Sequence, residues 1–184
     1  MDIEKTDIKG LILLKPRVFK DQRGEFLETF RDETMHKAGI SHPFVQDNIS
    51  VSQRGTVRGL HYQLPPYAQA KLIIAIKGTI LDVAVDLRKG SPTYGAHQKV
   101  TLSEENRHLF YVPAGFAHGF SVLSESATVY YKCSNYYHPD AERGVRWDDE
   151  ELAIDWEVSN PLISGKDQVQ PLFREVAPVE TSVV

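Results

Sequence analysis

Short runs of β-branched and aromatic residues recur along most of this chain, and glycine, proline, asparagine and aspartate separate them. This pattern is typical of short strands joined by tight turns. The sequence therefore predicts an all-β fold with a few short helices. We expect the strands to close into a jelly-roll barrel, because closure hides the strand edges and leaves a mouth for a ligand. The expected strands span residues 57–63, 72–76, 79–87, 97–102, 108–112, 119–123 and 127–133.

The clearest strand pair lies on either side of Lys77 and Gly78. This dipeptide separates two apolar runs, 72–76 and 79–87, and such a turn predicts a β-hairpin. In the second run the odd-numbered residues from 81 to 87 are all apolar and share one face. The opposite face carries two aspartates, Asp82 and Asp86.

Helices are expected in only two places. One runs from residue 33 to 38 with Gly39 as its C-terminal cap, and a single helical turn begins at Ser164. A length of 184 residues suits one domain, which we place at residues 1–176. Residues 177–184 have no periodic pattern and predict a flexible C-terminal tail.

Charge and composition exclude several classes of protein. A formal net charge of −4 argues against a nucleic-acid-binding surface, which is normally basic. No apolar run has the length of a membrane span, and the first residues lack the pattern of a signal peptide. A single cysteine, Cys133, cannot form an internal disulfide and suits a reducing compartment. We therefore expect a cytoplasmic protein without nucleic-acid or membrane partners.

The densest polar cluster lies at residues 58–63, with Lys71 shortly after it. His61 suits a general base near neutral pH, and a nearby lysine can stabilise a developing oxyanion. The alternative is a hydrogen-bonded strand histidine without a catalytic role. Strict alternation places Arg58 and His61 on opposite faces of a strand, so a shared cavity requires a bulge, for which Gly59 is the natural position.

Three further clusters carry candidate residues. A turn rich in proline and glycine precedes His118, which either faces a ligand or ties the turn. One of the adjacent tyrosines Tyr130 and Tyr131 must face inward, as a proton donor or as part of the core. Near the N-terminus, Arg23 suits a phosphate and Glu28 suits sugar hydroxyls, although a solvated turn is the default for this segment.

A metal site is not expected. Zinc or iron in a small barrel needs two or three histidines and a carboxylate that converge on one point. The strand that holds His61 has Gln63 where a second histidine would complete such a pair, and a carboxamide is a poor ligand for these metals.

These segments together, in this order, resemble the dTDP-4-dehydrorhamnose 3,5-epimerases. The resemblance extends over roughly residues 8–175. It rests on residues 19–26, 46–50, 58–63, 68–72, 82–88, 91–95, 112–120, 147–149 and 164–167, and on Tyr131, Tyr137 and Glu142.

The resemblance implies a cupin-type jelly roll that works as a homodimer without a metal or an organic cofactor. It also implies the substrate dTDP-4-keto-6-deoxyglucose, inverted at C3 and C5 to dTDP-4-keto-L-rhamnose. By this resemblance His61 is the base, Asp167 orients it, Tyr131 is the acid and Lys71 lies near the C4 oxygen. Tyr137 matches a ring that stacks on thymine. The other implied substrate contacts are Arg23, Glu28, Gln46, Asp47, Asn48, Arg58, His118, Glu142 and Lys166.

Three alternatives remain at this stage. An epimerase of an antibiotic-sugar pathway that acts at C3 or C5 alone shares the fold and most of these residues. A non-catalytic nucleotide-sugar-binding cupin would keep Arg23, Arg58 and Tyr137 without needing the pair of His61 and Asp167. A metal-dependent dioxygenase of the same fold would be revealed by metal analysis.

Overall fold

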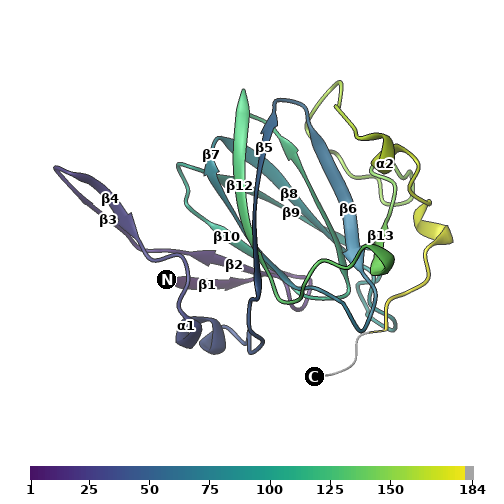
Figure 1. Cartoon of the computed structure of the whole chain (residues 1–184), viewed down its shortest axis with the longest axis horizontal. Coiled ribbons are helices and arrows are strands. Elements are labelled where there is room, and N and C mark those ends of the chain that lie inside the picture. The colour runs from purple at the N-terminus through teal and green to yellow at the C-terminus, as the bar shows by residue number, and fades with distance from the viewer. Residues whose placement is uncertain (181–184) are drawn as a thin grey trace.

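The computed structural model describes residues 1–180, and strands make up most of its regular structure (Figure 1). The strands are β1 (Asp2–Lys5), β2 (Ile12–Lys15), β3 (Val18–Asp21), β4 (Gly24–Leu27), β5 (Gln46–Gln53), β6 (Val57–Gln63), β7 (Lys71–Lys77), β8 (Thr79–Asp86), β9 (His97–Ser103), β10 (Leu109–Val112), β11 (Phe116–Val122), β12 (Ser126–Cys133) and β13 (Glu142–Gly144). Two α-helices, α1 (Asp32–Lys37) and α2 (Gly165–Gln168), and two 3-10 turns, Pro139–Ala141 and Phe173–Glu175, complete the elements. The all-β prediction is confirmed.

Two antiparallel sheets face each other. One has the strand order β1-β2-β10-β7-β12-β5 and the other β13-β6-β11-β8-β9. Ile73 of the first sheet packs with Ile80 and Phe120 of the second, and each is at most 5% exposed. Burial of such side chains is the main favourable contribution to folding. The predicted jelly-roll arrangement of facing sheets is therefore present.

β8, in the second sheet, is buried on both of its faces. Leu81, Val83 and Val85 of β8, with Leu87 just after it, pack against the C-terminal segment. This segment includes Trp156 and Phe173. The even-numbered residues Ile80 and Ala84 point to the space between the sheets. The face assignment from the sequence is thus confirmed, and the C-terminal segment explains why both faces of β8 are closed to water.

The predicted hairpin at Lys77 and Gly78 is wrong. β7 pairs with β10 and β12, whereas β8 pairs with β11 and β9, so the chain passes from one sheet to the other at Gly78. Gly78 has φ +74°, and a Cβ there would lie 2.1 Å from the carbonyl oxygen of Ser126. A tight crossing between sheets therefore needs glycine as much as a hairpin does.

The helices begin and end close to the predicted positions. α1 starts one residue earlier than expected, and Gly39 follows it with φ +87°. The Gly39 and Ile40 N–H groups donate to the carbonyls of His36 and Met35, as in a glycine-terminated helix. Ser164 caps α2 by accepting a hydrogen bond from the Asp167 N–H. No helix within residues 1–180 is long and apolar enough to cross a membrane.

The predicted C-terminal tail starts too early. Val179 is 1% exposed, and its N–H and C=O bond to Leu87 C=O and Lys89 N–H at 2.7 and 2.9 Å. Val179 therefore packs beside the second sheet, and it holds the segment there. One buried valine forms no periodic pattern, so the sequence carries no signal for it. The rest of the predicted tail, residues 181–184, lies outside the described residues.

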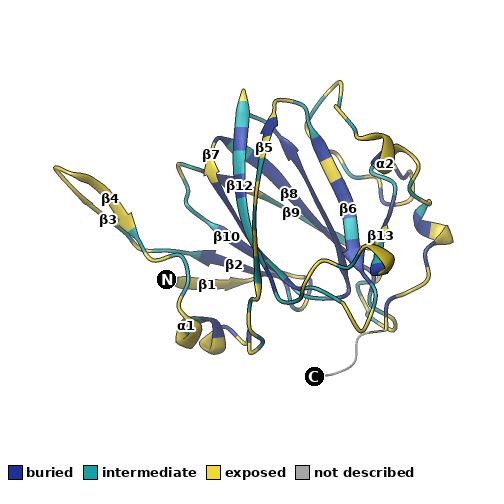
Figure 2. Cartoon of the chain, in the orientation of Figure 1, coloured by how far each residue is buried: buried dark blue, intermediate teal, exposed yellow. Residues whose placement is uncertain are grey.

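β3 and β4 form a hairpin that projects away from the sandwich, at the left of Figure 1. Figure 2 shows most of this hairpin as exposed. Phe19 and Phe26 face each other across its two strands, and they are 51% and 69% exposed. Two large, mostly exposed aromatic side chains on one projecting hairpin indicate an apolar surface.

Candidate active site

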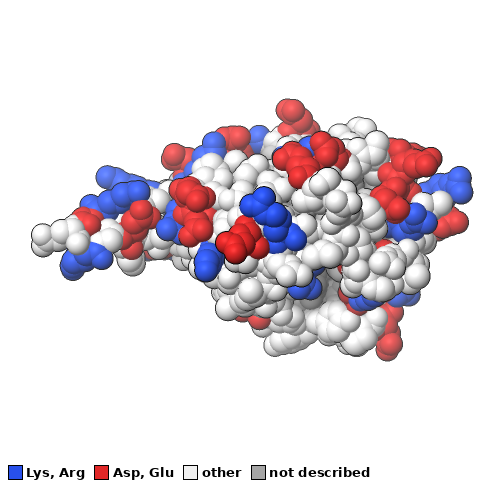
Figure 3. Space-filling view, turned by 90° about the horizontal axis from the view of Figure 1, so that it is seen from above, with Lys and Arg blue, Asp and Glu red and all other residues white. Residues whose placement is uncertain are grey.

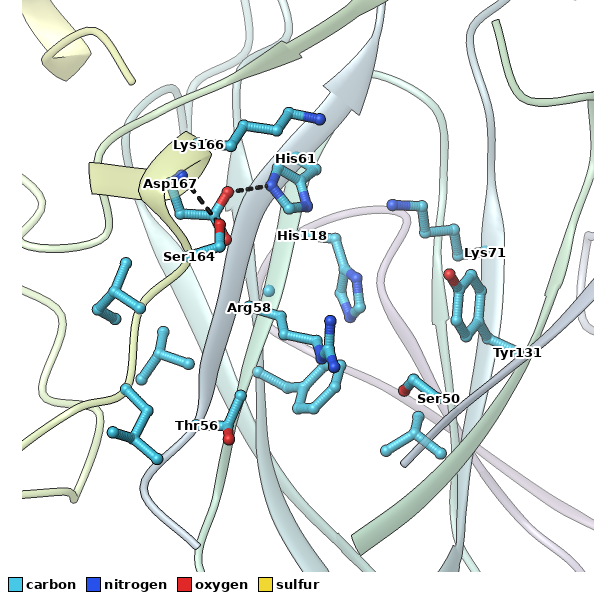
Figure 4. Close-up of a pocket in the computed structure, with 16 residues that line it drawn as sticks. Ser50, Thr56, Arg58, His61, Lys71, His118, Tyr131, Ser164, Lys166 and Asp167 are labelled. Atoms are coloured by element: carbon cyan, nitrogen blue, oxygen red, sulfur yellow. Dashed lines mark hydrogen bonds and ion pairs between the residues drawn. The ribbon is translucent and has the colours of Figure 1, made fainter. Parts of the chain in front are cut away.

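A cavity of about 600 Å³ lies between the two sheets, next to the segment that leads into α2 (Figure 4). On the face drawn in Figure 3, acidic and basic side chains are mixed. Among the described residues, the face in Figure 3 carries no broad basic patch, whereas Arg58, Lys71 and Lys166 line the cavity and can meet an anionic ligand. The polar side chains that line it are those of Ser50, Thr56, Arg58, His61, Lys71, His118, Tyr131, Ser164, Lys166 and Asp167.

His61 of β6 and Asp167 of α2 form a close pair at one wall. His61 Nε2 lies 2.6 Å from Asp167 Oδ1, and Asp167 is only 3% exposed. Burial by itself would raise the pKa of Asp167, but the hydrogen bond and the charge of His61 outweigh it and hold that pKa below its ordinary value. The carboxylate therefore fixes the ring through Nε2 and leaves Nδ1 as the nitrogen available to a ligand.

Arg58 and His61 share the cavity because β6 has a bulge at Gly59. His61 pairs with His118 of β11, whereas Arg58 pairs with Phe120, so three steps along β6 match two along β11. Gly59 has φ +117°, and a Cβ there would lie 2.6 Å from Gly119 Cα. The bulge that the sequence required is present, and it is possible only with glycine.

Gly59→Ala should lower the free energy of unfolding by about 3 kcal/mol, because the new methyl group meets backbone atoms and the backbone conformation disfavours any side chain. Gly24→Ala is the matched control, since Gly24 has φ +127° and open space around a Cβ. Its expected cost is only about 1–2 kcal/mol. Urea unfolding of both variants measures the difference, and equal losses would contradict the close approach of β6 and β11.

Lys71 of β7 and Tyr131 of β12 lie across the cavity from His61 (Figure 4). Lys71 pairs with Cys133, two residues beyond Tyr131, so both side chains project to the same side of the sheet. Burial raises the pKa of the Tyr131 phenol, which keeps the proton on it. Burial lowers the pKa of Lys71, which is opposed by nearby negative charges. The cavity thus sets a base and a phenol on opposite walls, with an amine between them.

His118 forms a second pair with a carboxylate. Its Nε2 lies 2.8 Å from Asp82 Oδ1, and the two residues are 8% and 0% exposed. The sequence indicated His118 as a candidate but gave Asp82 no role. The only signal for Asp82 was a carboxylate at a strand position whose neighbours on the same face, Ile80 and Ala84, are apolar.

A smaller cavity of about 260 Å³ adjoins the first one and shares His61, Lys71 and Tyr131 with it. Tyr137 lines it, and its hydroxyl donates to Glu142 Oε2 at 2.7 Å. The Lys166 ammonium donates to the same oxygen. The Tyr137 ring is 51% exposed, so it can still accept a flat ring against its face. The other predicted contacts that line this cavity are Gln46 and Asn48.

Asp47 lies outside both cavities, contrary to its predicted contact with a ligand. It accepts hydrogen bonds from the Tyr130 hydroxyl at 2.9 Å and the Lys132 ammonium at 2.8 Å. Successive residues of a strand point to opposite faces, so Gln46 and Asn48 turn toward the smaller cavity while Asp47 turns away from it.

Arg23 and Glu28 do not reach either cavity within this chain. Arg23 lies at the turn of the β3–β4 hairpin and bonds to Asp21, and Glu28 follows the hairpin and bonds to Arg31. Both ion pairs are exposed and contribute little to stability. The hairpin that carries Arg23, and that ends just before Glu28, projects away from the sandwich of its own chain (Figure 1).

Within residues 1–180, no three His, Cys, Asp or Glu side chains gather closely enough to hold a metal ion. Gln63, at the position that would complete a metal-binding pair with His61, bonds instead to backbone groups. Its amide donates to the Tyr67 carbonyl at 2.6 Å and accepts from the His138 N–H at 2.7 Å. Gln63 thus ties together two loops beside the smaller cavity.

Comparison with known proteins gives one consistent result. The family model for dTDP-4-dehydrorhamnose 3,5-epimerase matches residues 5–175. A dTDP-4-dehydrorhamnose 3,5-epimerase of Shigella flexneri is 49% identical over 168 residues, which cover 91% of this chain and 93% of that protein. The solved structure of the Legionella pneumophila dTDP-6-deoxy-D-glucose-3,5-epimerase, in complex with dTDP-4-keto-L-rhamnose, has a TM-score of 0.92 at 43% identity and covers 98% of this chain and 99% of that one.

A solved monoepimerase has the same fold. The structure of a 3′-monoepimerase from Streptomyces bikiniensis, in complex with dTDP-quinovose, has a TM-score of 0.85 at 37% identity and covers 91% of this chain and 85% of that one. The matches to the Shigella and Legionella enzymes extend over nearly the full length of both proteins. This chain belongs to the dTDP-4-dehydrorhamnose 3,5-epimerase family.

Proposed function

We propose that this chain inverts C3 and C5 of dTDP-4-keto-6-deoxy-D-glucose to give dTDP-4-keto-L-rhamnose, without a metal or an organic cofactor. One observation carries the proposal: the pair of His61 and Asp167 faces Tyr131 across a single cavity, with Lys71 between them.

We place the enzyme in the cytoplasm, because its one cysteine, Cys133, is buried and unbridged, which suits a reducing compartment.

The reaction needs a base, an acid and a cation around one ketone. His61 removes the hydrogen on the carbon next to C4, and the electron pair moves onto the C4 oxygen to form an enolate. Lys71 stabilises that oxygen, and such donors commonly contribute about 3–4 kcal/mol to the transition state. Tyr131 then donates its proton from the opposite face, which inverts the carbon. Solvent returns a proton to Tyr131 and takes one from His61, and the sugar ring shifts before the second carbon reacts at the same base.

The nucleotide part of the substrate has two matching regions. Arg58 and His118 lie in the larger cavity with Lys71, where they can meet negative charge. Tyr137 lies at the smaller cavity, beside side chains that can bond to the polar edges of a base. Binding far from the reacting carbons helps to hold the sugar in position for proton transfer.

Incubation with dTDP-4-keto-6-deoxyglucose in heavy water, followed by NMR, tests this function. Deuterium at C3 and C5 with a product of L-rhamno configuration is the expected result. Deuterium and inversion at one carbon alone would assign a single-site epimerase instead. No exchange at either carbon would leave a nucleotide-sugar-binding protein and end the proposal.

The enzyme works as a homodimer in this proposal, because Arg23 and Glu28 line neither cavity of their own chain and could reach one only in a second copy. The hairpin that carries Arg23 projects from its own chain and exposes Phe19 and Phe26. β5 lies at the edge of its sheet and exposes two more apolar side chains, Ile49 at 65% and Val51 at 67%. Burying both apolar surfaces against a second copy would bring the hairpin of one protomer toward the cavity of its partner.

Mixing two inactive variants tests this arrangement. Arg23→Ala and His61→Asn should each be nearly inactive alone, and unfolding and refolding them together should restore activity. Each mixed dimer then holds one cavity with the intact His61 of one chain and the intact Arg23 of the other. Steady-state activity of the refolded mixture, compared with each variant refolded alone, measures the effect. A mixture no more active than the sum of its parts would place Arg23 and His61 in the same protomer's site or outside any site.

A further inference from the structure

β8 carries a carboxylate into the interior of the sandwich. Asp82 is 0% exposed, and Ile80 and Ala84 on the same face belong to the apolar core. An apolar side chain at position 82 would simply extend that core. A buried carboxylate is costly unless hydrogen bonds and opposite charges compensate for the lost water. Asp82 therefore needs an explanation beyond packing.

Only half of this carboxylate is satisfied by the protein. Asp82 Oδ1 accepts from His118 Nε2 at 2.8 Å, whereas Oδ2 is buried without a hydrogen-bond partner in the part of the chain that the structure describes. The negative charge of Asp82 also acts on the ammonium of Lys71. His118 and Lys71 both line the larger cavity, and Asp82, which does not line it, lies behind His118.

The cavity thus contains two imidazoles of the same construction. His61 and His118 are directly paired across β6 and β11, and each is bonded through Nε2 to a buried carboxylate. Asp167 stands behind the first imidazole and Asp82 behind the second. The proposed mechanism uses only the first pair, so the second pair is available for another task at the same ketone.

We propose that Asp82 is a positioning residue for this reaction: it holds the His118 imidazole in the cavity wall and supplies a buried negative charge that favours the charged form of Lys71. With the His118 ring fixed beside it in the cavity, Lys71 then receives the C4 oxygen as it becomes negative. Donors that are fixed before the reaction stabilise such an oxygen better than mobile ones, because they need no rearrangement during the step. The inference rests on the proposed epimerase function.

The charge of Asp82 has a consequence for the pH dependence of activity. Burial lowers the pKa of Lys71, and the negative charges of Asp82 and Glu142 oppose that effect. Removing the Asp82 charge therefore lowers the pKa of Lys71 further, so the amine loses its proton at a lower pH. The titratable and charged groups that share a cavity with Lys71 or act on its charge are Asp82 of β8, Arg58, His61 and Tyr62 of β6, His118 of β11, Tyr131 and Cys133 of β12, Glu142 of β13, Lys166 and Asp167 of α2, and Tyr137.

Asp82→Asn tests the proposal, because asparagine keeps the shape and an acceptor for His118 but removes the charge. We expect kcat to fall about 10²-fold with KM unchanged, since the lost interaction acts on the transition state. We also expect the alkaline limb of the pH profile to move to lower pH. An unchanged kcat and an unmoved limb would overturn the proposal, even if the variant is less stable.

Asp86→Asn is the matched control. Asp86 lies on the same face of β8 and is also 0% exposed, but it bonds to Arg88 at 2.6 Å, outside both cavities. Loss of its charge should lower the melting temperature and leave the pH profile of the active enzyme as in the parent. A shift of the alkaline limb in both variants would show that any buried charge on β8 has this effect, and would overturn the specific role of Asp82.

A second measurement needs neither a variant that folds nor a substrate. In the parent protein, ¹⁵N NMR of the histidine rings should show a proton on His118 Nε2 that exchanges slowly with solvent, because Asp82 accepts it. An Nε2 without a proton would overturn the positioning role. This result does not depend on turnover, so failure of the epimerase assay and failure of the Asp82 proposal can be told apart.

Discussion

His61→Asn should abolish deuterium incorporation at both C3 and C5 and lower kcat by about 10³-fold. Asparagine can still bond to Asp167, which lies 2.6 Å from the ring nitrogen of the parent, but a carboxamide cannot take a proton at neutral pH. The single base in this cavity serves both carbons in the proposed mechanism, so the two exchanges should disappear together. NMR of the substrate in heavy water follows both carbons in one experiment.

The control for His61→Asn is another histidine outside the cavities. His42 bonds through Nε2 to the Tyr111 hydroxyl at 2.8 Å and lines neither cavity, so His42→Asn should keep both exchanges. Affinity for dTDP, measured by calorimetry, should stay similar in His61→Asn. Exchange that survives at one carbon would show a second base, for which His118 is the nearest candidate. Near-normal exchange at both carbons would end the assignment of His61.

Tyr131→Phe should lower the rate of epimer formation by about 10²–10³-fold while deuterium exchange continues at a much higher rate. His61 can still remove the hydrogen and return deuterium to the same face, which exchanges the position without inverting it. The missing phenol blocks only proton delivery from the opposite face. The ratio of exchange to inversion, read from one NMR time course, should therefore rise sharply.

Tyr130→Phe is the control on the same strand. The Tyr130 hydroxyl donates to Asp47 on the other face of the sheet, at 2.9 Å, so its loss should leave both rates near those of the parent. Equal losses of exchange and inversion in Tyr131→Phe would argue against its role as the acid. In that case the phenol would contribute to substrate binding or to the cavity wall instead.

Local pattern predicted the strands of this protein well and their partners less well. Residues 57–63 were expected as a strand and form β6 with those bounds. The two apolar runs around Gly78 were also correctly expected as strands, but their pairing as a hairpin was wrong. A strand buried in a sandwich has the same apolar pattern whether its sequence neighbour lies beside it or in the facing sheet. The turn residue alone cannot distinguish these two cases.

The candidate site shows the same division. The sequence indicated His61, Lys71, Tyr131 and Asp167, and the fold brings all four to one cavity. Asp47 was included because its neighbours in sequence belong to the site, yet alternation along β5 turns it away. Asp82 was missed because its contact with His118 joins residues 36 apart in the chain, and because its complete burial cannot be seen in the sequence.

By itself, the sequence determined the all-β class, the family and the residue types that can move a proton next to a ketone. These depend on local periodicity and on the order of motifs along the chain. Only the tertiary structure decided which sheet each strand joins, that β6 bulges at Gly59, and that the β3–β4 hairpin projects away from the sandwich. Such features depend on contacts between residues far apart in sequence. Hydrophobic burial selects those contacts, and because it is non-directional, the local pattern of apolar residues does not say which of them will meet.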